Sequence, residues 1–378
     1  MPLTKQRLKR IAGLDGLRAL AVAAVVLTHY GVLEDLQGSA LLPLVHGATG
    51  VRAFFVLSGF LITSLLLSEH RETGRISYRD FVARRALRIF PLYFLFLSLV
   101  SLLFVVGLWR TNPAGLTYAW LYVYNFVPAP LYDPLLAHTW SLAVEEHFYL
   151  FWPLALVFFA RSERALIAFI AFAAIVSFTS YIVLVRMGVR GGFLERWTIV
   201  AAFSLWVGCF AATVSHYRPG SALPRLCRSR AGPLVAVVLY AAPALLHLLP
   251  ALAERVVPAY AAVTLQSLAI AVLVLWISSN QDSRAVVALE FQPLRYLGTI
   301  SYGVYIWQGF FLAVSPLRNP ASAWPPSPTL GLLGVAVFAP LLYHLVEKPF
   351  LALKTRFPGS RSPSASGVLR REGNAENA

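Results

Sequence analysis

Apolar residues run along this chain of 378 residues in continuous stretches of about twenty, separated by short polar segments. A stretch of that length crosses the hydrocarbon core of a bilayer as an α-helix, whereas a membrane β-barrel shows alternating segments of about ten residues. The pattern predicts about ten transmembrane helices, which cover residues 11–33, 44–67, 89–108, 139–160, 164–185, 198–215, 232–250, 259–279, 298–315 and 329–346. We therefore expect an all-α polytopic membrane protein whose helical bundle occupies residues 1–350.

Composition supports this class, because 58% of the residues are hydrophobic and only 13% are charged, whereas soluble chains carry about 25% charged residues. With the N-terminus in the cytoplasm, 24 of the 32 Lys and Arg residues fall in inner segments and 6 in outer segments. Because Lys and Arg favour the cytoplasmic side, both termini are predicted to be cytoplasmic. Residues 351–378 are polar and basic, and we expect a disordered cytoplasmic tail there.

The positive net charge of +15 is thus mainly a topology signal. A nucleic-acid-binding protein gathers basic residues on a soluble face, and this chain has no soluble domain to present one, so we expect no nucleic-acid partner. Its two cysteines, Cys209 and Cys227, form neither a disulfide framework nor a metal-ligand cluster. We expect no metal site.

Two polar residues interrupt the first apolar stretch. Arg18 and His29 are eleven residues apart, which is about 1100° of helix and within roughly 20° of three full turns. Both side chains therefore share one helix face. Since an arginine in hydrocarbon costs roughly 2.5–3.5 kcal/mol on insertion scales, the pair has either a catalytic or transport role, or a structural role satisfied by neighbouring helices.

Two further clusters admit a structural and a functional interpretation. Arg84, Arg85 and Arg88 lie at the predicted inner membrane surface, where they either anchor the helix or clamp phosphate groups, whose oxygens match guanidinium forks. Ser58 and Gly59 interrupt the second apolar stretch. Gly59 is expected to allow close helix packing, and Ser58 to pack there or to donate a hydrogen bond to a ligand.

A polar segment begins the fourth predicted span with His138 and contains the adjacent carboxylates Glu145 and Glu146. Helical spacing places His138, Ser141 and Glu145 on one face, while Glu146 is rotated by about 100°. We expect one of the two carboxylates to pair with an arginine such as Arg52. At 1.5 Å per residue, the two carboxylates lie at a depth similar to that of His29, with Arg18 deeper and the arginine cluster at the inner face.

These motifs together resemble membrane acyltransferase family 3, the integral membrane O-acyltransferases of bacterial surface glycans and some small molecules. The resemblance rests on an Arg and a His separated by ten residues, and on segments 54–60, 84–93, 138–153, 300–308 and 347–349. Many family members carry a histidine in the ninth span, where this chain has Trp307 and Gln308.

The resemblance implies a multi-pass protein of the bacterial inner (plasma) membrane. It implies acyl-CoA, with acetyl-CoA favoured, as a cytoplasmic co-substrate and no permanently bound cofactor. The implied acceptor is a hydroxyl of a polysaccharide, a lipid-linked glycan or a glycosylated small molecule. The resemblance also assigns Arg18 and His29 to catalysis and donor binding, gives Glu145 a functional role, and matches Arg85 and Arg88 to the paired arginines of the family.

From these residues we expect His29 to act as the general base, Glu145 to orient it and Arg18 to stabilise anionic groups. Donor binding is expected from Arg84, Arg85, Arg88, Ser58 and Tyr93, and supporting roles from Glu146, Trp140, Ser141 and Tyr302. A covalent acyl-histidine relay stays open. The alternatives from other classes are a transporter or channel that uses Arg18, His29 and Glu145 as an ion or proton path, and a non-catalytic lipid-binding or assembly protein.

Overall fold

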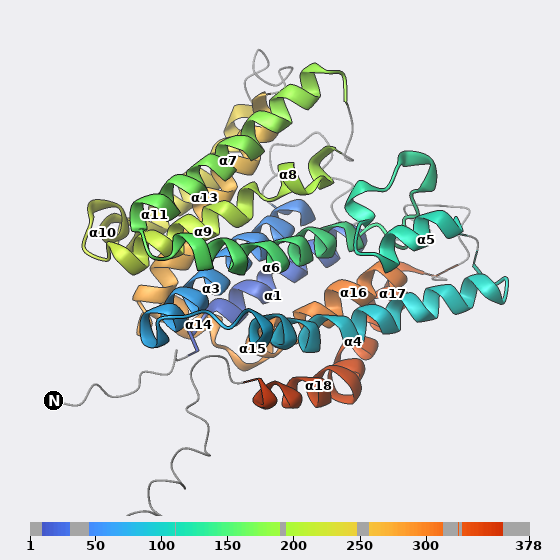
Figure 1. Cartoon of the computed structure of the whole chain (residues 1–378). Coiled ribbons are helices and arrows are strands. Elements are labelled where there is room, and N and C mark those ends of the chain that lie inside the picture. Colours follow the sequence, from blue (N-terminus) through green and yellow to red (C-terminus); the bar gives the residue numbers. More distant parts are fainter. Residues whose placement is uncertain are drawn as a thin grey trace, which may run out of the picture.

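A computed structural model describes residues 10–30, 45–109, 111–189, 194–247, 257–312, 324 and 327–357 of the chain. Within these residues the protein is all-α, without a strand (Figure 1). The elements are α1 (Leu14–Tyr30), α3 (Gly47–Thr73), α4 (Tyr78–Val105), α5 (Pro113–Trp120), η2 (Tyr124–Phe126), η3 (Ala129–Leu131), α6 (Thr139–Phe159), α7 (Glu163–Arg186), η4 (Leu194–Arg196), α8 (Thr198–Ala201), α9 (Phe203–Tyr217), α10 (Ala222–Arg228), α11 (Gly232–His247), α13 (Val257–Ser279), α14 (Arg284–Leu289), α15 (Gln292–Thr299), α16 (Ser301–Phe311), α17 (Pro328–Leu342), the π-helix η5 (Tyr343–Glu347), α18 (Lys348–Ala352) and η6 (Leu353–Arg356).

Each of the ten predicted spans contains a helix, but the helices differ in length. Among the described residues, seven helical segments are long and apolar enough to cross a membrane: Gly47–Thr73, Tyr78–Val105, Thr139–Phe159, Glu163–Arg186, Thr198–Tyr217, Tyr260–Ser279 and Pro328–Arg356. The other three predicted spans correspond to α1, α11 and α16, with 17, 16 and 11 residues. The class of an all-α polytopic membrane protein is confirmed.

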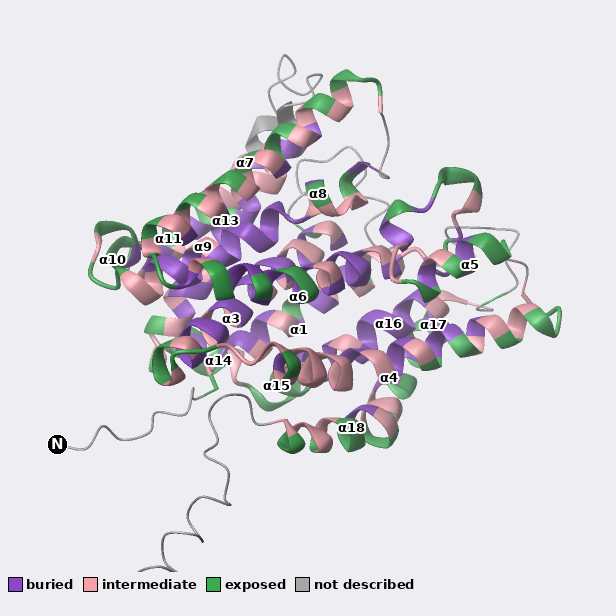
Figure 2. Cartoon of the chain, viewed as in Figure 1, coloured by how far each residue is buried: buried purple, intermediate pink, exposed green. Residues whose placement is uncertain are grey.

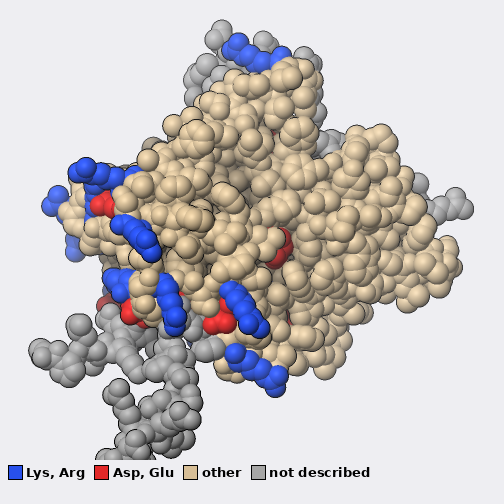
Figure 3. Space-filling model, in the orientation of Figure 1, with Lys and Arg blue, Asp and Glu red and all other residues tan. Residues whose placement is uncertain are grey.

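Charged side chains gather at one end of the bundle and are scarce along its flanks, as in membrane proteins. Lys and Arg gather mainly at the end of the bundle that carries α10, α14 and α18, and the flanks between the two ends are almost uncharged (Figure 3). Exposed side chains on the outer helices α4 and α7 surround an interior of buried residues on α1, α3 and α9 (Figure 2). This arrangement suits a bundle whose flanks face lipid.

Helices α3 and α9 pack closely because each has a glycine at the contact. A Cβ atom at Gly59 would lie 2.2 Å from the carbonyl oxygen of Leu205, and one at Gly208 would lie 2.2 Å from that of Val56. Any larger residue would push the two backbones apart. The expected packing role of Gly59 is confirmed.

The predicted boundary of the C-terminal tail is too early. Helical structure continues through α18 and η6 to Arg356, and the Phe357 carbonyl accepts a hydrogen bond of 2.8 Å from Arg84 on α4. Residues 358–378 of the predicted disordered tail lie outside the described residues. The tail segment up to Phe357 is therefore attached to the bundle.

The start of α1 is fixed by a carboxylate from the α14–α15 connection. Glu290 accepts hydrogen bonds from the Gly13 backbone N–H at 2.6 Å and from Arg10 Nη1 at 2.8 Å. Burial works against ionisation of Glu290, but the hydrogen bonds from Gly13 and Arg10 outweigh it and hold the pKa of Glu290 below its usual range. This contact sets where α1 begins, and with it the position of Arg18.

We expect Glu290→Gln to lower stability at pH 7 by about 1.5–3 kcal/mol, the usual contribution of a hydrogen bond to a charged group. A carboxylate with a depressed folded-state pKa stabilises the fold above its unfolded pKa, near 4.3, and this contribution is lost as the pH falls through the folded-state value. Thermal unfolding in detergent should therefore separate the wild type from Glu290→Gln at pH 7, with the gap narrowing below about pH 4. A gap that is independent of pH would contradict this role.

Candidate active site

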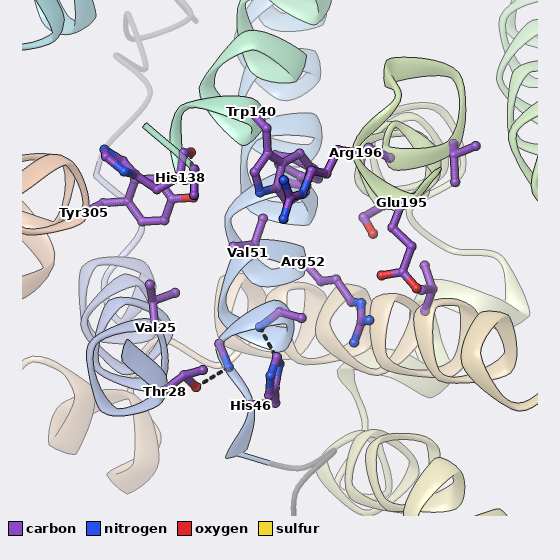
Figure 4. A pocket seen from close by; sticks show the side chains of 18 of the residues that line it. Val25, Thr28, His46, Val51, Arg52, His138, Trp140, Glu195, Arg196 and Tyr305 are labelled. Carbon is purple, nitrogen blue, oxygen red and sulfur yellow. Dashed lines mark hydrogen bonds between the residues drawn. The ribbon is translucent and has the colours of Figure 1, made fainter. Parts of the chain in front are cut away.

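Two adjoining cavities lie inside the bundle. The larger, which we call the His29 cavity, has a volume of about 610 Å³ (Figure 4). Its polar and charged lining includes His29, His46, Arg52, His138, Glu195 and Arg196. The smaller, which we call the arginine cavity, has a volume of about 90 Å³. Its polar and charged lining includes Arg18, Ser58, Arg85, Arg88, Glu145 and Tyr149. Val51, Phe55 and Tyr305 line both cavities, so the two cavities meet at these side chains.

The arginine cavity has more positive than negative charge. Arg18 on α1 and Arg85 and Arg88 on α4 act on one another electrostatically, and Glu145 is the carboxylate in the same lining. The Arg18 guanidinium lies 3.3 Å from Asp15. Because three guanidinium groups face one carboxylate in this lining, the cavity is suited to an anionic ligand.

Glu145 is held within the arginine cavity by α3. Its Oε1 accepts a hydrogen bond of 2.7 Å from Ser58 Oγ, which also lies 3.2 Å from the Tyr149 hydroxyl. The Arg85 guanidinium lies 5.5 Å from the centroid of the Tyr149 ring. Tyr149 follows Glu145 by one helical turn, so α6 presents both to the same site.

His29 lies in the last turn of α1 and lines the other cavity. Its Nδ1 lies 2.8 Å from the carbonyl oxygen of Val25. Because a carbonyl oxygen only accepts hydrogen bonds, Nδ1 carries the proton, and in the neutral ring the acceptor lone pair is on Nε2. This tautomer is the one that a general base acting through Nε2 requires.

The predicted contact between Glu145 and His29 is not supported. Glu145 accepts its hydrogen bond from Ser58 in the arginine cavity, whereas His29 lines the other cavity. The two residues lie at similar predicted depths along the membrane normal, but depth does not fix the lateral position of two helices. Phe55 and Tyr305, which line both cavities, mark the junction between them.

The supporting residues are divided between the cavities. Trp140 lines the His29 cavity, and Ser141 and Tyr302 line the arginine cavity. The Ser141 hydroxyl lies 2.6 Å from that of Tyr305, and the Tyr302 hydroxyl donates to the Ile89 carbonyl at 2.7 Å. These bonds join α6, α16 and α4 around the junction.

Tyr93, Arg84 and Arg52 have partners other than the expected ones. The Tyr93 hydroxyl donates to the Ala119 carbonyl at 2.7 Å in the apolar core, and Arg84 donates to the Phe357 carbonyl. Neither residue lines the His29 cavity or the arginine cavity. Arg52 donates to the side chain of Gln266 rather than pairing with Glu145 or Glu146. Glu146 is only 7% exposed, and its Oε1 has no hydrogen-bond partner among the described residues.

Several lining residues were absent from the expected set. Tyr305 and Tyr149 both lie in the segments 300–308 and 138–153 that carry the family resemblance, and Tyr149 follows Glu145 by one helical turn. The Arg196 guanidinium lies 4.7 Å from the centroid of the Tyr132 ring, in the connection before α8, where the sequence predicts only a charged outer loop. Its place in the cavity follows from tertiary packing alone.

Residues 11–345 match the family model described as an acyltransferase domain. The chain belongs to this membrane acyltransferase family. This membership favours acyl transfer over the transporter, channel and lipid-binding alternatives. No solved structure matches the chain.

Curated relatives of this chain include a putative peptidoglycan O-acetyltransferase of Bacillus subtilis, YrhL, which is 30% identical over 97% of the chain and 58% of the relative. The peptidoglycan O-acetyltransferase OatA of Listeria monocytogenes is 27% identical over 92% of the chain and 56% of the relative. A putative O-acetyltransferase of Staphylococcus aureus is 37% identical over 40% of the chain and 26% of the relative. The chain thus spans little more than half the length of the first two relatives.

Proposed function

We propose that this protein transfers an acetyl or other short acyl group from acyl-CoA to a hydroxyl of a glycan at the bacterial plasma membrane. The observation that carries the proposal is the junction of the two cavities at Val51, Phe55 and Tyr305. An acyl-CoA whose phosphates bind in the arginine cavity can extend its thioester through this junction into the His29 cavity. The names of the peptidoglycan O-acetyltransferase relatives support both the acyl group and the glycan acceptor.

The donor site is assigned to Arg18, Arg85 and Arg88. Guanidinium groups bind phosphate oxygens in bidentate fashion, and the nucleotide of coenzyme A carries several phosphates. Whole ligands usually occupy about 300–1,000 Å³, so a cavity of about 90 Å³ holds only part of coenzyme A, which we assign as the pyrophosphate and the pantetheine next to it. The adenosine is expected at the charged end of the bundle (Figure 3).

The reaction is assigned to His29. Its Nε2 accepts the proton of the acceptor hydroxyl as the oxygen bonds to the acyl carbon, and the carbon–sulfur bond then breaks. The thiolate leaves and takes the proton from the imidazolium. An acyl-histidine relay would use the same nitrogen. Glu145, with Ser58, is assigned to holding Arg85 in the donor site.

The acceptor is assigned to the His29 cavity, whose volume of about 610 Å³ falls within the usual range for a bound ligand. A sugar of a surface polysaccharide or lipid-linked glycan fits this assignment, and a glycosylated small molecule is the alternative. Trp140, Tyr132 and Tyr181 supply aromatic faces in the same lining, which suits the apolar faces of a sugar ring.

The test uses the purified protein with acetyl-CoA and peptidoglycan oligosaccharides. Release of free thiol should depend on the acceptor, and mass spectrometry should find an ester-linked acetyl group on the glycan. Acetyl-CoA without acceptor is the control for hydrolysis. Thiol release that never yields an acylated glycan or glycosylated metabolite would contradict the proposal.

A further inference from the structure

The His138 ring occupies a buried position beside the junction of the two cavities. The residue precedes α6, is 5% exposed and lines the His29 cavity. Its ring centroid lies 5.8 Å from that of Tyr305 and 5.2 Å from that of Phe96 (Figure 4 shows His138 beside Tyr305). Both ring nitrogens are buried and have no hydrogen-bond partner among the described residues.

The surrounding residues hold His138 in this place without using its ring nitrogens. Its backbone carbonyl accepts hydrogen bonds from Ser141 at 3.1 Å and from Tyr305 at 3.2 Å. On α16, a Cβ atom at Gly309 would lie 2.1 Å from Nδ1 of the His138 ring. Only glycine at this position therefore leaves enough space for the ring. Buried polar groups in proteins are normally paired, and a ring held this firmly without a partner indicates a ligand that supplies one.

The position of His138 also relates it to the proposed base. His29 and His138 line one cavity and are close enough to interact electrostatically. A neutral imidazole has one N–H donor and one acceptor nitrogen. In the proposed reaction the donor thioester enters through the junction that Tyr305 lines. A ring N–H of His138, which lies beside Tyr305, would then face the acyl carbonyl.

We propose that His138 donates a ring N–H hydrogen bond to the carbonyl oxygen of the transferred acyl group, an inference that rests on the transfer reaction proposed above. As the acceptor oxygen bonds to the acyl carbon, its proton passes to His29 and the carbonyl electrons move to the oxygen. His138 stabilises that oxyanion. When the carbonyl re-forms, the carbon–sulfur bond breaks and the thiolate takes the proton from His29.

The variants His138→Phe and His138→Gln separate this role from packing. Phenylalanine keeps the aromatic contacts with Phe96 and Tyr305 but has no donor, and we expect turnover to fall about 10²–10³-fold, as for loss of one oxyanion donor. Glutamine restores an N–H donor, so the turnover of His138→Gln should reach about a tenth of the wild-type rate or more. The affinity for coenzyme A and the thermal midpoint should stay near wild type for His138→Phe.

His147→Phe, on the helix α6 that follows His138, is the matched control. His147 lines neither cavity, contacts Thr198 at 2.8 Å and stacks on Phe126, so its turnover should stay near wild type. Gly309→Ala, which displaces the His138 ring, should reproduce the loss of His138→Phe. In the wild type labelled with ¹⁵N-histidine, the ring N–H proton signal of His138 should move downfield when a ketone analogue of acetyl-CoA is bound.

Three results would overturn the inference. These are near-normal turnover of His138→Phe, equal loss in the Phe and Gln variants, and a His138 ring N–H signal that the analogue does not move. The last result is decisive even where the variants fail to fold, because it uses the wild-type protein. A wild type that forms no acylated product defeats the proposed function instead, and the two failures are therefore distinguishable.

Discussion

His29→Ala is expected to bind coenzyme A with near wild-type affinity and to turn over about 10²–10⁴ times more slowly, the usual worth of general acid–base catalysis. Binding should survive because the arginines line the smaller cavity and His29 lines the larger one. Turnover should fall because the contact of Nδ1 with the Val25 carbonyl directs the basic nitrogen, Nε2, to the reaction. Calorimetry with coenzyme A and a thiol-release assay measure the two quantities.

His46→Asn provides a comparison within the same cavity. His46 accepts the Ala48 N–H through Nδ1 and caps α3, and asparagine retains a capping oxygen. Its loss of turnover should be far smaller than that of His29→Ala. If His29→Ala turns over at a near-normal rate, His29 has no part in the chemistry, and an acyl-histidine relay is excluded with it.

The positions of the helices could be predicted because lipid imposes a strict requirement. Backbone groups in a bilayer must be hydrogen-bonded within the chain, so each long apolar stretch becomes a helix, as α3, α4 and α6 show. The shared face of Arg85 and Arg88 was equally predictable from their spacing, and both line the arginine cavity. Local periodicity was sufficient for these features.

Partners across the bundle could not be predicted in this way. Sequence spacing gives the depth and rotation of one helix, but not which helix stands beside it. Glu145 therefore has Ser58 of α3 as its partner rather than His29. Arg84 shares a helical face with Arg88, yet the Phe357 carbonyl, 273 residues away in the sequence, accepts its hydrogen bond. Contacts of this range depend on the packed fold.

Replacing Arg85 and Arg88 together by glutamine is expected to raise the Michaelis constant for acyl-CoA by about 10²–10⁴. Hydrogen bonds to charged groups contribute about 1.5–3 kcal/mol each, and each 1.4 kcal/mol is about a factor of ten in affinity. Two lost phosphate contacts therefore give a change of this size. Steady-state kinetics with acetyl-CoA at a fixed acceptor concentration measure it.

A short acetyl thioester without the nucleotide distinguishes phosphate binding from a general loss of structure. The double variant should use this donor about as well as the wild type does, because the thioester and His29 are unchanged. Arg84→Gln is the matched single-charge comparison on α4, and since Arg84 bonds to the Phe357 carbonyl outside the cavity lining, it should raise the Michaelis constant far less. An equal loss with both donors would show that Arg85 and Arg88 anchor α4 in the membrane rather than bind the nucleotide.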